Sequence, residues 1–124
     1  MSKDYVAIAV DYYTALGKKE FEEIESYLHP EVQFVAPLAK IAGKEVVFEA
    51  AKKFTTFFKT LKVRAKFGSG DQAMIVYDLD CPTPLGAFSA AALLTFKEGL
   101  IGKIELFYDA RPFEKHKDEI FSKS

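Results

Sequence analysis

The chain has 124 residues and a mass of 13.9 kDa, the size of a single domain. Its formal net charge of −1 gives no general attraction to nucleic acid or to an anionic membrane, so neither is expected as a partner. The single cysteine, Cys81, excludes an internal disulfide, and no apolar leader or membrane-length run is present. These features predict a cytoplasmic protein.

Apolar residues change their spacing along the chain from helical to alternating, which predicts helices first and strands later. In chain order we expect helices over 3–16 and about 18–28, a strand over 31–36, a loop over 37–43, a helix over about 44–60, and strands over 62–67, 72–80, 87–96 and 104–109. Gly17 and Pro30 would end the first two helices. Helices that precede a run of strands joined by short turns predict an α+β domain, with the helices on one face of an antiparallel sheet.

Two features suggest an internal cavity. Hydrophobic residues make up 49% of the chain, and 12 residues are Phe, so aromatic side chains remain to line a pocket once a core is built. The middle of the 87–96 strand carries the small residues Ala90, Ala91 and Ala92. They would either leave space between sheet and helices or let a helix pack closely.

The final strand carries the residue with the clearest functional interpretation. Both faces of this strand are largely apolar, and Asp109 is the last residue on the face that carries Phe107. A carboxylate at the end of a strand covered on both sides is costly unless something pairs with it or uses it. Asp109 is therefore either an acid/base group in a pocket or a strand-end carboxylate that accepts hydrogen bonds from the backbone or Arg111.

Four short motifs, in this order and spacing, identify a family. They are Leu28-His29-Pro30-Glu31-Val32 between second helix and first strand, Pro37 with Gly43-Lys44-Glu45 before the third helix, Pro84-Leu85-Gly86 between strands, and Gly102-Lys103-Ile104 followed by Asp109. Over about residues 4–114 the chain resembles the nuclear transport factor 2-like superfamily, and within it the SnoaL-like polyketide cyclase group.

The resemblance implies a cone in which a strongly curved antiparallel sheet wraps around the helices, in the order α-α-β-α-β-β-β-β. It also implies an apolar pocket for a small hydrophobic, oxygen-bearing ligand, no cofactor, and a homodimer formed through the outer sheet face. Because such proteins include cyclases, isomerases, hydrolases and non-catalytic binders, the fold does not decide the activity.

The resemblance assigns three catalytic candidates. Asp109 matches the last-strand acid/base Asp of SnoaL-like cyclases, Asp78 the second acid of limonene-epoxide hydrolases, and Tyr12 the first-helix Tyr of ketosteroid isomerases. An Asp in an apolar pocket has a raised pKa because its charged form is desolvated, which suits proton exchange near neutral pH. Asp78 could instead be a solvated strand-end carboxylate, and Tyr12 a core or interface tyrosine beside Tyr13.

The match to each relative is incomplete. The Arg of the epoxide hydrolases falls on Val76, and the acids of the isomerases fall on about Ala36 and Ala92, which argues against either of those mechanisms. The residues expected to contact a ligand are Gln33, Val35, Phe54, Phe58, Val76, Ala92 and Phe107. His29 and His116 lie far apart and form no metal-ligand pattern.

Three functions therefore stay open. The first is a cofactor-independent enzyme in which Asp109 exchanges a proton, assisted by Asp78 or Tyr12. The second is a non-catalytic binder of hydrophobic ligands in the same cone. The third is an interaction module that acts through the outer sheet face.

Overall fold

The computed structural model describes residues 4–82 and 86–109. Its elements are α1 (Tyr5–Lys18), α2 (Phe21–Ser26), β1 (Leu28–Ala36), β2 (Ala39–Ala42), α3 (Lys44–Phe54), β3 (Thr60–Ser69), β4 (Gln72–Asp80), β5 (Ala87–Lys97) and β6 (Leu100–Phe107). The α+β class is confirmed. The Pro84-Leu85 part of the third motif lies outside the described residues. No described helix is both long and apolar enough to cross a membrane.

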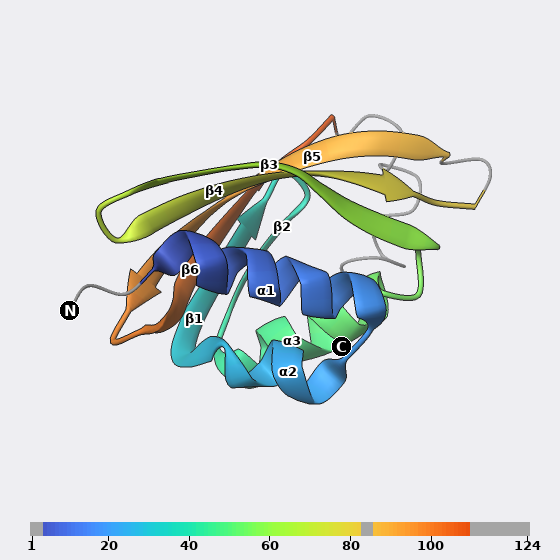
Figure 1. The fold of residues 1–124 in the computed structure, drawn as a ribbon. Helices are drawn as coiled ribbons and strands as arrows, with labels where there is room; N and C mark the ends of the chain where they lie inside the picture. The colour runs from blue at the N-terminus through green and yellow to red at the C-terminus, as the bar shows by residue number, and fades with distance from the viewer. Residues whose placement is uncertain (1–3, 83–85, 110–124) are drawn as a thin grey trace.

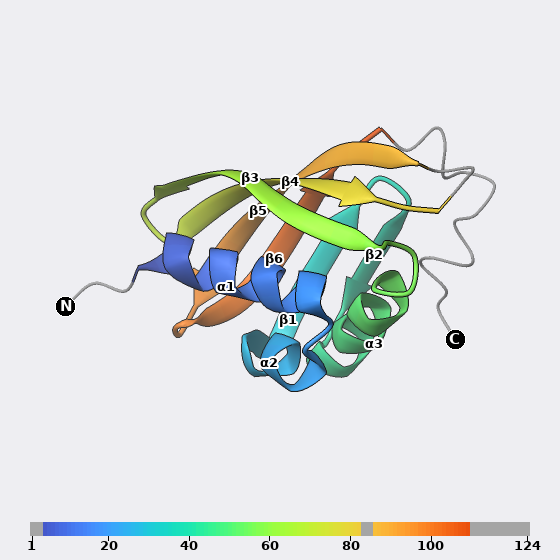
Figure 2. The same ribbon diagram turned by 45° about the vertical axis from the view of Figure 1, so that its right-hand side comes forward.

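The strands form one sheet in the order β2-β1-β6-β5-β4-β3. Neighbouring strands are antiparallel except β1 and β6, which are parallel, so the sheet is mixed. In Figures 1 and 2 the sheet bends so that β3, β4 and β5 arch over α1, while β1, β2 and β6 descend toward α2 and α3. We call the face packed against α1 and α3 the inner face, and the opposite face the outer face.

The segment between β1 and α3 is not the loop that the sequence predicted. Residues 39–42 form the edge strand β2, which pairs with the end of β1 from Ala36↔Ala39 to Gln33↔Ala42. Four residues bounded by Pro37 and Gly43 are too few to show an alternating pattern of their own, so their strand state depends on the neighbour they pair with.

Helix α1 runs through Gly17 and does not stop there. A Cβ at Gly17 would lie 3.1 Å from the Leu61 carbonyl oxygen, so the glycine allows close approach of α1 to β3. The helix ends at Lys18, followed by Lys19 in the left-handed conformation (φ 59°). The glycine that suggested a helix end therefore serves packing.

Helix α3 ends at Phe54, earlier than predicted. The hydroxyls of Thr55 and Thr56 donate hydrogen bonds to the carbonyls of Lys52 and Lys53 (2.6 and 2.7 Å). These bonds satisfy carbonyls at the end of the helix, where the backbone has no intrahelical donors left.

A bulge in β3 changes the side of the sheet on which two apolar residues lie. The sequence predicted Val63, Ala65 and Phe67 on one face, but the register shifts between Val63 and Ala65. Val63 pairs with Tyr77, whereas Ala65 pairs with Val76 and Phe67 with Met74. Phe67 consequently lies on the outer face, where it is 63% exposed.

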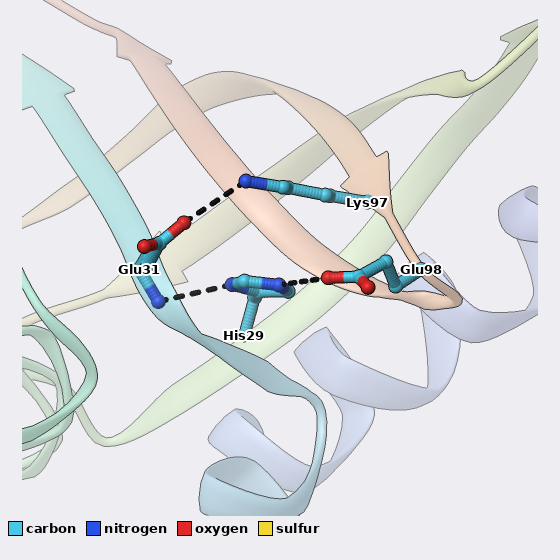
Figure 3. A network of polar contacts seen from close by, with 4 residues as sticks. All are labelled: His29, Glu31, Lys97 and Glu98. Carbon is cyan, nitrogen blue, oxygen red and sulfur yellow. Dashed lines mark hydrogen bonds and ion pairs between the residues drawn. The ribbon is translucent and has the colours of Figure 1, made fainter.

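A second irregularity lies in β1, which begins at Leu28 and therefore includes His29, ahead of the predicted strand start at residue 31 (Figure 3). The pairing of β1 with β6 shifts between Leu28 and Gln33. Within this stretch, the buried His29 ring accepts a hydrogen bond at Nδ1 from the Glu31 backbone N–H (3.0 Å). Its Nε2 therefore carries the proton and donates to Glu98 (2.7 Å) in the β5–β6 turn. This bond ties β1 to the hairpin beside it.

Candidate ligand cavity

A small cavity lies between the helices α1 and α3 and the inner face of the sheet. Figure 2 shows these two helices on the concave side of the bent sheet. Its volume is about 40 Å³. A water molecule needs about 10–15 Å³ on a comparable measure, so the cavity has room for a few waters or a small organic molecule. The lining residues are Tyr12, Tyr13 and Leu16 of α1, Phe34 of β1, Val47, Ala50, Ala51 and Phe54 of α3, Tyr77 of β4, and Ile104 and Leu106 of β6.

The space comes from small residues on α3 and not from the alanines of β5. The apolar stripe of α3 faces the cavity, and Ala50 and Ala51 stand there where larger side chains would fill it. Ala90 and Ala92 of β5 are buried on the inner face but lie outside the cavity lining.

The polar groups of the lining are three phenols. The rings of Tyr13 and Tyr77 stack with their centroids 4.8 Å apart and an angle of 29° between planes. Tyr12 meets Tyr13 edge-on, with centroids 5.1 Å apart. Burial raises the pKa of all three tyrosines above the ordinary value near 10, because a phenolate would be desolvated there. The cavity is therefore lined by neutral groups at physiological pH.

Burial is the largest cause of the raised pKa of both Tyr13 and Tyr77. The neighbouring Tyr77 and Tyr12 phenols raise the pKa of Tyr13 further. For Tyr12, burial is the one cause of its raised pKa.

Of the residues selected from the sequence, Tyr12 and Phe54 line the cavity. Phe58 and Ala92 are buried in the core beside it, outside the lining, with the Phe58 ring centroid 5.2 Å from that of Phe54. The chain thus brings these four residues to one side of the sheet.

Four other residues expected to contact a ligand lie on the opposite, outer face. Gln33 and Val35 flank Phe34, Val76 precedes Tyr77, and Phe107 follows Leu106. Because side chains alternate along a strand, the presence of Phe34, Tyr77 and Leu106 in the lining places their neighbours on the other side. These four residues therefore lie outside the lining of this cavity.

Asp78 also lies on the outer face, next to Tyr77. Its carboxylate accepts a hydrogen bond from the Ser89 hydroxyl (2.6 Å) and lies 3.5 Å from the Arg64 Nε. The side chain is 46% exposed. Asp78 is part of a surface polar cluster and does not meet Tyr12 or the cavity.

Asp109 follows the end of β6 at Phe107 and is exposed, outside the lining of the cavity. The sequence argument required its carboxylate to be enclosed by apolar surroundings. In the described structure the wall of the cavity at β6 is formed instead by Ile104 and Leu106, whose side chains lie on the inner face of the strand.

Sequence reasoning did not select the lining residues that lie on the strands, which are Phe34, Tyr77, Ile104 and Leu106. Tyr77, Ile104 and Leu106 each belong to a recognisable alternating face, and that alternation was the available signal. The alternating pattern does not show which of the two faces of a strand the helices cover. Among residues 4–82 and 86–109, no group of three or more His, Cys, Asp or Glu side chains is placed to hold a metal ion.

Comparison with known proteins finds one matching family and several similar structures. A family model described as a SnoaL-like domain matches residues 9–104. A steroid delta-isomerase from Pseudomonas aeruginosa is similar in structure (TM-score 0.79, 16% identity, covering 97% of this chain and 90% of that one). An NTF2-like protein of unknown function from Cytophaga hutchinsonii is similar too (TM-score 0.78, 19% identity, covering 91% and 96%). No curated protein sequence matches significantly.

The buried phenols predict a loss of stability at high pH. Above about pH 10 the unfolded chain releases tyrosine protons that the folded chain retains, so the free energy of unfolding falls by about 1.4 kcal/mol per pH unit for each such tyrosine. Urea unfolding should show a stability difference between wild type and Tyr13→Phe that is constant from pH 7 to 9. Above pH 10 the stability advantage of wild type over Tyr13→Phe should fall by about 1.4 kcal/mol per pH unit, because the variant has no phenol proton to retain. A difference that stays constant to pH 12 would contradict the burial of the Tyr13 hydroxyl.

Proposed function

The chain belongs to the SnoaL-like domain family, and from this premise we propose that it binds a small, uncharged, oxygen-bearing hydrophobic molecule in the cavity between α1, α3 and the inner face. The observation that carries the proposal is the composition of the lining. Aliphatic and aromatic side chains surround three phenol groups, Tyr12, Tyr13 and Tyr77. A concave apolar site with a few convergent polar groups is the usual form of a small-molecule site.

The charge of the ligand follows from the lining. None of the described side chains that line the cavity is charged at neutral pH. An ion buried there without a counter-ion would lose its hydration with little compensation. A neutral molecule loses less, and its oxygen can accept a hydrogen bond from a phenol.

The size of the ligand follows from the volume. A cavity of about 40 Å³ suits a guest of a few heavy atoms. A larger, polycyclic guest would require α3 to move away from the sheet, because Val47, Ala50 and Ala51 form one wall.

Acid/base catalysis by Asp109 is the finer hypothesis, and the placement of the residue does not favour it. Asp109 is exposed and lies outside the cavity lining, and Asp78 lies on the outer face. Structural relatives of this fold include a steroid delta-isomerase, but 16% identity carries the fold and not the reaction. We therefore propose ligand binding as the function, without assigning a proton transfer to Asp109.

Filling the cavity should abolish binding. Uncharged ketones, ethers and hydrocarbons of about four to six heavy atoms would be titrated while methyl NMR signals of Leu16, Val47, Ile104 and Leu106 are followed. Shifts should concentrate on these methyls. Ala51→Leu should weaken binding by about tenfold or more because the larger side chain occupies the space. Ala7→Leu, at an exposed position of α1, is the matched control and should bind as wild type does. Equal binding by both variants would contradict the proposed site.

We also propose that the protein forms a homodimer through an apolar area of the outer face. This outer patch consists of Ala65, Phe67, Met74, Val76, Ala91, Leu93 and Phe107, which are cross-strand neighbours on β3, β4, β5 and β6. Phe67 is 63% exposed and Phe107 is 51% exposed. The other five residues of the patch are half-buried. A contiguous apolar area with two exposed Phe side chains is typical of an association surface.

A charge placed in the outer patch should separate the two copies. Sedimentation at protein concentrations of about 10–100 μM should show a dimer for wild type and a monomer for Phe67→Lys, because association would bury the new charge without a partner. Thr14→Lys, on the exposed side of α1, adds the same charge elsewhere and should leave the dimer intact. A wild-type protein that is monomeric over this range would refute the dimer.

A further inference from the structure

We infer that His29 is a proton-sensitive latch on the start of β1. The neutral ring holds the irregular stretch of this strand in place, and the ring releases that stretch when it gains a second proton. As a latch on β1, this assignment stands without any ligand. As a means of regulating the cavity, it rests on the proposed function, because β1 supplies part of the cavity wall through Phe34.

The latch lies in the bulged stretch of β1. Between two points of pairing, five steps along β1 (Leu28 to Gln33) are matched by two steps along β6 (Ile101 to Lys103). Backbone N–H groups in such a bulge need acceptors outside the regular ladder. Pro30 has no N–H to satisfy. The N–H of Glu31 donates to the His29 ring at 3.0 Å, so a side chain takes the place of a strand partner here.

This hydrogen bond requires a neutral ring. A backbone N–H can only donate, so Nδ1 of His29 carries a lone pair and the proton of the ring is on Nε2. A second proton would be placed on Nδ1, where it would point at the N–H of Glu31. Two donors cannot share one hydrogen bond, so the charged ring and this N–H must separate. His29 is only 6% exposed, which leaves little water to replace the lost partner.

The same surroundings offer partners to the charged ring (Figure 3). The Glu98 carboxylate lies 2.7 Å from Nε2, and the Glu31 carboxylate accepts a hydrogen bond from Lys97 (2.9 Å). This bond and the charge of Lys97 hold the pKa of the Glu31 carboxyl below its ordinary value. Carboxylates are ionised in the range, about pH 6–7, in which histidines usually gain a proton. The proton is thus attracted by two carboxylates while it breaks the backbone bond, which makes the ring a switch.

The backbone of Glu98 supports its part in the latch. Glu98 lies in the β5–β6 turn with a φ of 55°, in the left-handed region that favours glycine. A non-glycine residue kept in this region at a conformational cost points to a use for its side chain. The bond that the structure shows for this side chain is the one to Nε2 of His29.

The bulge is connected directly to the cavity. Beyond the register shift, Phe34 of β1 pairs with Ile104 of β6, and both residues line the cavity. The register of a strand decides which of its side chains face inward. Opening the latch removes a support of the register that turns Phe34 inward, so the cavity should hold a guest less well when His29 is charged.

NMR of the full chain without ligand, from about pH 8 to about pH 5, tests the latch. At the upper pH, the ring ¹⁵N shifts should show an unprotonated Nδ1 and a protonated Nε2. As His29 gains its second proton, the Glu31 amide should lose about threefold to tenfold in hydrogen-exchange protection, the range expected for one net hydrogen bond. Protection is corrected for the intrinsic effect of pH on exchange. A proton on Nδ1 already at pH 8, or Glu31 protection that ignores the titration of the ring, would overturn the latch.

Three variants separate His29 from other titrating groups. His29→Asn places an amide oxygen near the position of Nδ1, so Glu31 protection should no longer depend on pH. His116→Asn removes the other histidine of the chain and should leave the transition as in wild type. Glu98→Gln keeps an acceptor but removes a charge, so the transition should move to lower pH. Loss of protection in His29→Asn over the wild-type range would refute the latch. If this variant does not fold, the titration of the wild-type ring still decides.

Acetone binding, followed by the methyl signals of Ile104 and Leu106, extends the test to the cavity. Wild type should bind acetone about fivefold or more weakly at pH 5.5 than at pH 7.5, the lower end of the usual coupling between two sites. His29→Asn should bind equally at both. Equal binding by wild type would overturn the coupling to the cavity. If acetone binds at neither pH, the proposed function fails, while Glu31 protection still decides the latch.

Discussion

The packing of α1 and α3 against one face of the sheet determines what each strand residue can do. Side chains alternate between faces along a strand, so covering the face of Phe34, Tyr77 and Leu106 commits their sequence neighbours to the outside. In β1, the face on which each side chain lies is set after a register shift between Leu28 and Gln33. The His29 ring accepts a hydrogen bond from the Glu31 N–H within this shifted stretch. A buried ring outside the cavity lining thus helps decide that Phe34, and not Gln33, faces the cavity.

The same packing gives the cavity its chemical character. Two alanines on α3 leave space, while aromatic rings from α1, β1, β4 and α3 close around it. Their burial keeps the phenols protonated, so the site offers hydrogen-bond donors without charge. The chain belongs to the SnoaL-like domain family, and its architecture is a curved mixed sheet packed against helices. The small volume and uncharged lining are properties of this chain's own residues, and they favour a neutral guest over acid/base chemistry.

Much of the fold could be predicted from the sequence, because hydrophobic spacing reports the type of each element. The order of helices and long strands follows from it, as does the inward stripe of α3. The site could not be predicted to the same degree. Alternation along β4 and β6 defines two faces but does not say which one the helices cover. The sequence therefore favours Val76 and Phe107 as cavity residues over Tyr77 and Leu106, and it leaves Asp78 open between the cavity and the solvent.

Local irregularities added further differences. The bulge in β3 turned Phe67 outward, and β2 is too short to carry a pattern. Gly17 resembles a helix stop, yet it allows α1 to approach the Leu61 carbonyl. Each of these depends on a neighbour distant in sequence, which single-sequence periodicity does not contain.

The central claim is that the space enclosed by α1, α3 and the Leu106 side of β6 is a binding cavity. Diffraction from crystals pressurised with xenon tests it most directly, because xenon enters apolar cavities whatever their natural ligand. We predict a xenon atom in contact with Tyr77, Ala51 and Leu106. Crystals with no xenon between α3 and the sheet, or with the Asp109 carboxylate occupying that space, would contradict the account.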